Sequence, residues 1–192
     1  MKKRVLVFAI AIAASSFTQA SPVAEKKVAA PNAQTAPKSA IVESAFSPDG
    51  GAEALILKVI DTSTSTIRLA AYSFTSPNIV RALVNAKKRG VDVKVAVDEK
   101  RNEDKANVAA LNLLVTAAIP TRTVSAYALH HDKYIIADER TVQTGSFNYS
   151  KAAANRNSEN VVVIWNNPKV AKSFIGHWED RWAKGVAYKA SF

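Results

Sequence analysis

The sequence predicts an α/β domain built on a mixed β-sheet that is flanked by helices on both faces. Segments with apolar residues at helical spacing alternate along the chain with short apolar runs rich in β-branched residues. Several of these runs contain few polar residues, which is typical of strands buried on both faces, so helices are expected on each side of the sheet. The 192 residues, 48% of them hydrophobic, contain no internal repeat and suffice for one folded domain.

The first half of the domain is expected to alternate helix and strand twice. Asp49 is a candidate cap for the first helix, and Ser76 followed by proline is a second capping signal. Valine alternates with polar or small residues over 91–98, which is the period of a strand. The expected elements are a helix with apolar positions over 52–60, a strand over 67–74, a helix that begins at 77 and ends in the cations and glycine of 87–90, and a strand over 91–98.

The second half is expected to hold four strands between two helices. The mixed charges of 98–105 predict a solvated loop and make it a poor phosphate-binding candidate. The turn residues 138–140 favour pairing of the two strands beside them, and Asn167-Pro168 is a helix start. The expected elements are a helix over 104–118, strands near 121–129 and over 133–137, 141–145 and 161–165, and a final helix with an apolar stripe at Val170, Phe174, Trp178 and Trp182.

The first forty residues are expected to lie outside the folded domain. Residues 1–20 have a basic start, an apolar run too short to span a membrane and a small-residue end, which is the pattern of a cleavable signal peptide. Residues 21–40 are rich in Ala, Pro and Lys and are expected to form a flexible linker. The expected domain covers 41–192, and the expected location is the periplasm or the medium.

The composition indicates an anionic partner and excludes several kinds of site. The formal net charge is +10, and loss of the first twenty residues, which hold three basic side chains and no acidic one, leaves +7. Zero cysteines exclude a disulfide scaffold, an iron–sulfur cluster and a thiolate zinc site. An all-histidine metal site would need all three histidines of the chain. No metal and no other cofactor is therefore expected.

One short segment of the second half contains the candidate chemistry. In a strand, side chains two positions apart share a face, so His131 and Lys133 project together while His130 and Asp132 point away. An imidazole beside a fixed cation offers a nucleophile next to a site for phosphoryl oxygens. Residues 145–148 add a hydroxyl and an amide as neutral hydrogen-bond donors. Because no cluster of carboxylates accompanies them, the pattern predicts metal-free phosphoryl transfer.

The same segment resembles the signature of the phospholipase D superfamily. That signature is H-x-K-x4-D, followed after six residues by G-S-x-N. The matching positions are His131, Lys133, Asp138, Gly145, Ser146 and Asn148. The similarity extends over nearly all of 41–182, and the most similar type is the small, exported, chelator-resistant bacterial endonuclease. The resemblance implies a phospholipase D-like fold with one motif per chain.

The resemblance also implies how the reaction proceeds. Family members use one motif histidine as the nucleophile and form a covalent phosphohistidine, so His131 is the expected catalytic nucleophile. Lys133 and Asn148 are expected to be catalytic by holding the non-bridging phosphate oxygens, and Ser146 is expected to assist in binding the phosphate.

Three further positions take roles from the same resemblance. Glu159 corresponds to the acid that family members use to orient the nucleophilic imidazole through its other nitrogen, and it is counted among the catalytic residues. Asp138 and Gly145 belong to the signature, and their expected contribution is to hold local structure.

One motif per chain has a consequence for assembly. The family mechanism needs a second motif histidine, which protonates the leaving oxygen. A homodimer with its active site at the two-fold axis supplies one His131 and one Lys133 from each subunit. Two imidazoles near two ammonium groups favour one neutral and one cationic ring, which are the base and the acid that the reaction needs.

The favoured function is nonspecific endonuclease hydrolysis of phosphodiester bonds in DNA, with RNA as a further substrate. Basic surface supplies phosphate affinity, and no helix-turn-helix or aromatic RNA platform is evident. One alternative is a phospholipase D that acts on phosphatidyl headgroups, although no amphipathic membrane helix is evident and no stable membrane insertion is expected. The other alternative is a noncatalytic, basic nucleic-acid-binding protein.

The remaining histidines have less specific interpretations. His130 is an alternative nucleophile, but it has no lysine two positions later. His177 lies beside the apolar stripe of the last helix, and its expected role is packing. Lys87 and Lys88 are expected first as charges at a helix C-terminus and second as contacts to DNA.

Overall fold

The computed structural model describes residues 41–191, so the predicted signal peptide and linker lie outside the described residues. The elements of this part follow in chain order. They are β1 (Ile41–Ser47), α1 (Ala52–Thr62), β2 (Thr66–Ala71), α2 (Pro77–Lys88), β3 (Asp92–Asp98), the 3₁₀ turn η1 (Lys100–Asn102), α3 (Lys105–Thr116), β4 (Thr121–Val124), β5 (Lys133–Ala137), β6 (Thr141–Gly145), α4 (Lys151–Asn155), β7 (Glu159–Trp165), α5 (Pro168–Lys184) and β8 (Val186–Ala187).

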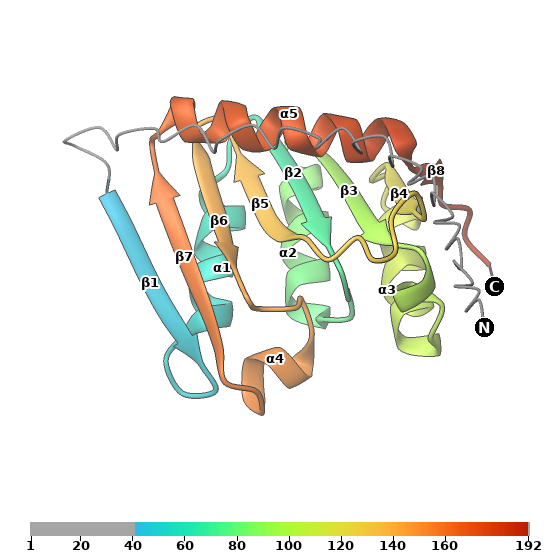
Figure 1. The fold of residues 1–192 in the computed structure, drawn as a ribbon, viewed down its shortest axis with the longest axis horizontal. Coiled ribbons are helices and arrows are strands. Elements are labelled where there is room, and N and C mark those ends of the chain that lie inside the picture. Colours follow the sequence, from blue (N-terminus) through green and yellow to red (C-terminus); the bar gives the residue numbers. More distant parts are fainter. Residues whose placement is uncertain (1–40, 192) are drawn as a thin grey trace, which may run out of the picture. The chain divides into compact units, whose positions relative to one another are not determined.

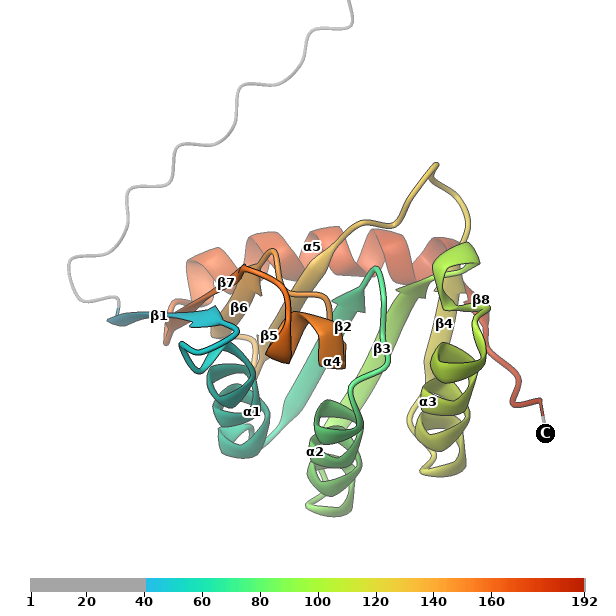
Figure 2. The same ribbon diagram turned by 90° about the horizontal axis from the view of Figure 1, so that it is seen from below.

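One sheet joins all eight strands in the order β1-β7-β6-β5-β2-β3-β4-β8. β2, β3 and β4 run parallel to one another, and the other neighbours pair antiparallel. Helices α1, α2 and α3 cover one face of the sheet, and α5 crosses the other (Figure 1, Figure 2). The predicted α/β fold, a mixed sheet with helices on both faces, is therefore confirmed.

The alternation of side chains along the central strands supplies two hydrophobic cores. Leu69 and Ile135 belong to the larger core, on the side of α1, α2 and α3, while Ala70 and Tyr134 belong to the smaller core under α5. Trp178 of α5 is buried and donates a hydrogen bond from Nε1 to the carbonyl of Leu69 at 3.0 Å. Burial on both faces explains the nearly continuous apolar runs of these strands.

The structure departs from the predicted elements at short or edge segments. β1, α4 and β8 were not predicted, because β1 is an edge strand fixed by its pairing with β7, and the other two hold five and two residues. The prediction that Asp49 caps α1 is wrong, because Gly51 occupies the cap position with a left-handed φ of 78°. The strands predicted over 67–74 and 121–129 end at Ala71 and Val124, where the chain leaves the sheet.

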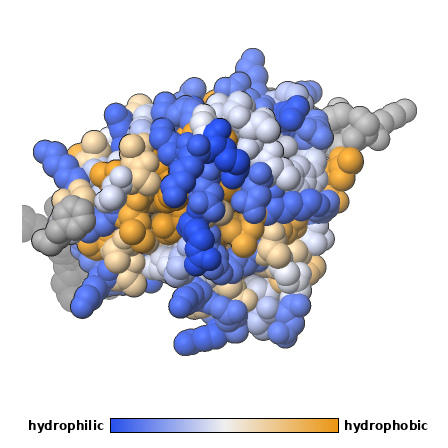
Figure 3. Space-filling model, turned by 180° about the vertical axis from the view of Figure 1, so that it is seen from behind, coloured by the Kyte–Doolittle hydropathy of each residue, from blue (hydrophilic) through white to orange (hydrophobic). Residues whose placement is uncertain are grey.

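The outer face of α1, α2 and α3 shows a column of hydrophilic side chains with hydrophobic surface beside it (Figure 3). A cavity of about 460 Å³ lies between α2 and α3, and apolar side chains such as Val80, Val84 and Leu113 line it. None of the described helices combines the length and the apolarity that crossing a bilayer requires. None of the predicted site residues lines this groove; they lie at the ends of strands and in the loops beside them.

Candidate active site

Most of the candidate residues lie near one end of the central strands. β2 ends and β5 begins at this end, with Ala71 opposite Lys133 in the antiparallel register. β6 ends there at Gly145, which lies opposite Val161 near the start of β7. The rigid sheet therefore holds the loops that contain the site residues close to one another.

His131 and Lys133 lie side by side, as their spacing predicts. Nζ of Lys133 lies 3.2 Å from Nδ1 and 3.3 Å from Nε2 of His131, and it donates to the carbonyl oxygen of His131 at 3.0 Å. The ring of Tyr72 packs against the imidazole with the centroids 4.5 Å apart, and Nζ of Lys133 lies 5.2 Å from the same ring. Tyr72 lies outside the motif, and sequence reasoning misses it because only the pairing of β2 with β5 brings it to His131.

The ammonium group of Lys133 is mostly removed from solvent. The residue is 8% exposed, whereas His131 is exposed. Burial lowers the pKa of Lys133, and the nearby negative charges of Glu159 and Asp132 oppose that shift. A buried cation of this kind is stabilised by an anionic ligand, and phosphate is such a ligand.

Gly145 and Ser146 hold β6 and β7 close together. A Cβ atom at Gly145 would overlap the backbone carbonyl of Asn160, so glycine is required here. Oγ of Ser146 donates to Oε2 of Glu159 at 2.5 Å and accepts from the backbone N–H of Asn160 at 3.0 Å. The motif glycine and serine therefore fix the start of β7, which carries Glu159.

Both carboxylate oxygens of Glu159 accept hydrogen bonds from neighbouring side chains. Oε1 accepts from Nδ2 of Asn157 at 2.9 Å, and Oε2 accepts from Ser146. Within residues 41–191, Glu159 makes no hydrogen bond with His131, the contact that the resemblance implies. Glu159 acts on Lys133 through its charge, which raises the pKa of the ammonium group against the effect of burial.

Asn148 lies in the loop that follows β6. The next residue, Tyr149, forms a bridge with Phe74 after β2, and its carbonyl accepts two backbone hydrogen bonds at 2.8 Å. Because β5 lies between β6 and β2 in the sheet, this loop crosses the end of β5 where Lys133 lies. Oδ1 of Asn148 is buried and has no hydrogen-bond partner among the described residues. This oxygen lacks a donor, and only Nδ2 of the same side chain can donate to a phosphate oxygen.

The other two histidines, His130 and His177, both lie close to Asp132. Oδ2 of Asp132 lies 2.9 Å from Nε2 of His177 and 3.5 Å from Nδ1 of His130. Burial lowers the pKa of His130, and the negative charges of Asp132 and Asp98 oppose that shift. The ring of His177 packs against Tyr134 with the centroids 6.0 Å apart. Sequence reasoning anticipates this packing but misses the hydrogen bond to Asp132, because 45 residues separate the partners.

A cavity of about 390 Å³ opens beside His131 and Lys133, on the side of α5. The strands and the loop before β5 supply His131, Asp132, Lys133, Tyr134, Thr144 and Gly145, and α5 supplies Ser173, Phe174 and His177. Among residues 41–191, no group of three or more acidic or histidine side chains is arranged to hold a metal ion. The lining presents two imidazoles, an ammonium group, a carboxylate and hydroxyl groups.

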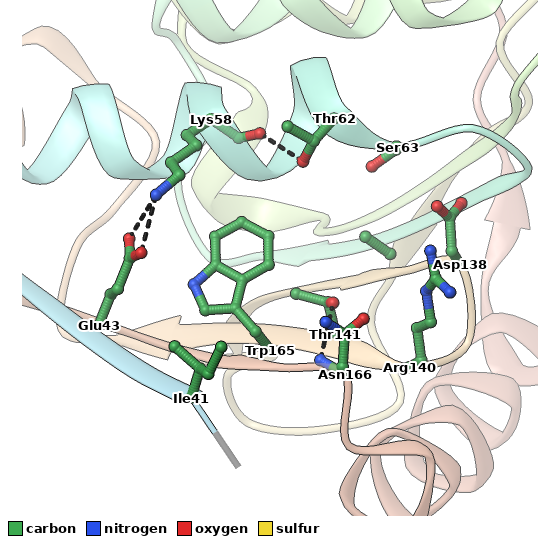
Figure 4. A pocket seen from close by; sticks show the side chains of 11 residues that line it. Ile41, Glu43, Lys58, Thr62, Ser63, Asp138, Arg140, Thr141, Trp165 and Asn166 are labelled. Atoms are coloured by element: carbon green, nitrogen blue, oxygen red, sulfur yellow. Dashed lines mark hydrogen bonds and ion pairs between the residues drawn. The ribbon is translucent and has the colours of Figure 1, made fainter. Parts of the chain in front are cut away.

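Asp138, the remaining motif residue, lies at the far end of β5. It follows the strand that Lys133 begins, and five strand residues span about 17 Å. Its carboxylate accepts hydrogen bonds from backbone N–H groups of 64–66 at 2.8 to 3.1 Å. Partial burial raises the pKa of Asp138, but these hydrogen bonds outweigh it and lower the pKa to about 2. Asp138 borders a separate cavity of about 340 Å³ with Trp165 (Figure 4), and neither His131 nor Lys133 lines that cavity.

Known proteins match this chain over most of the described residues. The family model "Cardiolipin synthase, PLD-like domain" matches residues 56–182. A protein named phospholipase D from Rickettsia bellii is 36% identical over 143 residues, which cover 74% of this chain and 70% of the relative. The mitochondrial cardiolipin hydrolase of Mus musculus is 28% identical over 71% of this chain and 61% of the relative.

Solved structures match as well. The crystal structure of Nuc from Salmonella typhimurium, described as a phospholipase D family member, is 53% identical with a TM-score of 0.77, over 78% of this chain and 99% of that chain. NucT from Helicobacter pylori is 18% identical with a TM-score of 0.64, over 77% of this chain and 100% of that chain. At that identity the second match supports the fold alone.

Proposed function

This chain belongs to the phospholipase D superfamily, and we propose that within it the protein is a metal-independent endonuclease. Family membership supports the broader activity, hydrolysis of phosphodiester bonds. The proposed substrate is DNA, with RNA as a second substrate, and cleavage has little sequence preference. The net charge of +10 supports a polyanionic substrate, because basic surface gains affinity from phosphate contacts and counterion release.

The observation on which this proposal rests is the contact between His131 and Lys133 at the cavity. It places a nucleophile and a phosphate-binding cation within 3.3 Å of each other. Asn148, whose Nδ2 is proposed to donate to a phosphoryl oxygen, lies in the loop that crosses the end of the same strand. These groups would supply the nucleophile and the electrostatic stabilisation of the phosphoryl oxygens, and the general acid would come from a second histidine.

The proposed reaction has two displacements at phosphorus. In the first, a ring nitrogen of His131 forms a bond to phosphorus, the bond from phosphorus to the leaving oxygen breaks, and that oxygen takes a proton from His131 of the partner subunit. In the second, water attacks phosphorus, the P–N bond breaks, and the water proton passes to the same partner imidazole. Lys133 and Asn148 hold the non-bridging oxygens, with Ser146 assisting.

Glu159 is proposed to support this pair rather than to touch the phosphate. Its hydrogen bond with Ser146 positions that hydroxyl, and its charge helps to keep Lys133 protonated despite burial. Orientation of the imidazole by Glu159, which the family resemblance implies, is proposed for the assembled and substrate-bound enzyme.

We propose that the second histidine comes from a second copy of the chain. On the edge strand β1, Val42 and Phe46 point to the α5 side of the sheet and are 58% and 59% exposed. The connection from β4 to β5 protrudes on the same side (Figure 2), and it includes Leu129, which is 52% exposed and two residues before His131. A two-fold contact through this face would cover these apolar side chains and bring both copies of His131 to the axis.

The names of the relatives favour a second candidate function, hydrolysis of phosphatidyl headgroups by a phospholipase D. The Rickettsia bellii relative has that name, and the mouse relative is named a cardiolipin hydrolase. Because the scissile bonds of nucleic acids and phospholipids are both phosphodiesters, His131 and Lys133 would serve either substrate. A noncatalytic nucleic-acid-binding protein is the remaining alternative.

One assay separates these functions. The protein is incubated in excess EDTA with plasmid DNA and, separately, with vesicles of phosphatidylcholine or cardiolipin. His131→Ala and the exposed α2 variant Arg81→Ala, purified in the same way, serve as test and control. Plasmid cleavage that persists in EDTA, is retained by Arg81→Ala and is lost in His131→Ala supports the endonuclease. Headgroup release without plasmid cleavage supports the phospholipase, and DNA binding with neither activity supports the noncatalytic protein.

We also propose that residues 1–20 direct export to the periplasm or the medium. Expression of the full chain in a bacterium, followed by fractionation and N-terminal sequencing, tests this. A mature protein outside the cytoplasm that begins near residue 21 is expected. Full-length protein that stays in the cytoplasm would exclude export.

A further inference from the structure

A second cavity, of about 300 Å³, adjoins the catalytic pair between the loop after β2 and the start of α4. Its lining includes Tyr72, whose ring packs against His131, and Asn148, whose amide is proposed to hold the reacting phosphate. We propose that this cavity binds a second phosphate of the same polynucleotide strand, next to the phosphodiester that is cleaved. This inference rests on the proposed endonuclease function and names a subsite for its substrate.

The charges of the lining favour an anion. Arg101, after β3, and Lys151, at the start of α4, are the charged residues that line the cavity, and no acidic residue of the described chain does so. Lys151 is exposed and forms no ion pair within residues 41–191. Arg101 pairs with Asp104 at 2.7 Å, but these side chains are 39% and 73% exposed. An ion pair this exposed contributes little stability. A phosphate can therefore replace Asp104 as the partner of the Arg101 guanidinium group at small cost in free energy.

The fold separates the mixed charges that made 98–105 a poor phosphate-binding candidate in sequence. Asp98 is buried and accepts from the backbone N–H of Arg101 at 2.7 Å, and Glu99 accepts from Thr123 at 3.3 Å. Neither acid lines the cavity. The prediction that 98–105 binds phosphate poorly therefore does not apply to the side chain of Arg101.

Neutral polar groups complete the lining. Hydroxyl and amide side chains can donate to phosphate oxygens without the cost of burying further charge. They belong to Ser73, Thr75, Asn148, Ser150 and Asn157. Oδ1 of Asn148 is buried without a partner in the described chain, but an amide oxygen only accepts hydrogen bonds, so it is Nδ2 of this side chain that would donate to the phosphate.

Two phosphate sites on either side of the contact between Tyr72 and His131 fit a polymer of phosphodiesters. Phosphatidylcholine carries one phosphate and would leave this cavity unused, whereas each internal linkage of a polynucleotide has neighbours on both sides. Binding of a neighbouring phosphate lets the enzyme use strand affinity to position the linkage at His131. The cavity therefore favours polynucleotides over single phosphodiesters as substrates.

The first test compares two charge-matched double variants on a single-stranded oligonucleotide in excess EDTA. Arg101→Gln with Lys151→Gln removes the cavity charges, and Arg81→Gln with Arg140→Gln removes two exposed charges that do not line the cavity. For the cavity variant we expect kcat/KM to fall about tenfold, as for loss of one charge-assisted hydrogen bond. The slope of log kcat/KM against log salt should also become shallower by about 0.7, the value for one phosphate contact. Equal losses in both variants would overturn the subsite.

The second test is a double-mutant cycle, in which the cavity variant is combined with a modified substrate. The linkages on the 5′ and 3′ sides of a single cleavable site are replaced in turn by a neutral methylphosphonate. For one of the two replacements, we expect kcat/KM of the wild-type enzyme to fall about tenfold relative to the unmodified substrate. The same replacement should leave kcat/KM of the cavity variant unchanged. Equal costs in both enzymes would show that no such subsite exists.

Other outcomes separate failure of the subsite from failure of the proposed function. If wild-type enzyme does not cleave the unmodified oligonucleotide, the endonuclease proposal itself fails. If cavity charges matter for cardiolipin vesicles and not for oligonucleotides, the second phosphate belongs to a lipid and the inference is wrong. Melting curves and hydrolysis of bis(p-nitrophenyl) phosphate check that the variants are folded, and Lys151→Gln alone replaces the double variant if that does not fold.

Discussion

Nζ of Lys133 lies almost equidistant from the two ring nitrogens of His131, at 3.2 Å from Nδ1 and 3.3 Å from Nε2. The cation is therefore in place beside the proposed nucleophile before any substrate binds. Their spacing at the start of β5 brings the two side chains together, and Tyr72 packs against both. Such preorganisation lowers a reaction barrier because little reorganisation is left for the transition state.

Replacing Lys133 should separate activity from stability. Lys133→Met is expected to lower kcat by about 10²- to 10³-fold, because a donor to the phosphoryl oxygens is lost. Its Tm should not fall, because methionine removes a charge that is costly to bury. Initial rates in EDTA and thermal melts check both. A destabilised variant with full activity would show that Lys133 is structural.

The pH profile should reflect the lowered pKa of Lys133. The proposed role needs the protonated ammonium, so activity should fall as pH rises through a pKa below the ordinary lysine value of 10.5. In Lys133→Arg the guanidinium stays charged, so the alkaline decline should move to higher pH in the activity that remains. Profiles of kcat/KM for the two enzymes test this. Identical alkaline declines would mean that another group controls them.

Asp138 is expected to stabilise the fold rather than to act in catalysis. Its pKa of about 2 lies below the ordinary value of 3.8, so its stabilising effect is complete above about pH 4 and disappears as pH falls through 2. Asp138→Asn should lower the free energy of unfolding at pH 7 by about 1 to 2 kcal/mol, allowing for partial solvent exposure. Urea unfolding from pH 7 down to pH 2 measures this difference. A constant difference across that range would argue against the role of the carboxylate.

Gly145 should tolerate no side chain. Gly145→Ala would force β6 away from the carbonyl of Asn160 and disturb the Ser146–Glu159 hydrogen bond, with an expected cost of about 1–3 kcal/mol and reduced activity. Gly176→Ala in α5 is the control, because nothing lies within 4 Å of the added methyl group and alanine favours helix. Thermal melts should show the first variant less stable and the second unchanged or more stable.

Mixing subunits should show whether the active site is shared. Wild-type and His131→Asn proteins are unfolded together in equal amounts and refolded, so that half of the dimers contain one chain of each kind. If every turnover needs both copies of His131, about one quarter of the wild-type activity should remain, because mixed dimers are inactive. Retention of about one half would mean that each subunit works alone.

Local patterns in the sequence sufficed for most of the fold and for the motif, because the signals lie close together along the chain. The cap at Ser76, the valine alternation of β3 and the His131–Lys133 spacing each depend on neighbouring residues. β1 escaped prediction because its long-range pairing with β7 determines its conformation. The contact of Tyr72 with His131 depends on pairings between distant strands, which periodicity does not reveal.

The surroundings of the site also depend on contacts between residues far apart in the sequence, which local patterns do not reveal. The hydrogen bond between His177 and Asp132 joins α5 to the loop before β5 across 45 residues. The cavity of Arg101 and Lys151 forms only when the segments after β2, β3 and β6 fold to the same end of the sheet. Composition indicates an anionic ligand, but only the fold shows these two cations lining one cavity with Asn148.

The stereochemical course at phosphorus tests the proposed mechanism most directly. An oligonucleotide with one phosphorothioate linkage of known configuration is cleaved in ¹⁸O-water with excess EDTA, and the configuration of the product is determined. Attack by His131 followed by attack of water is two in-line displacements, so the account predicts net retention. Inversion, which a single attack by water produces, would contradict the phosphohistidine intermediate.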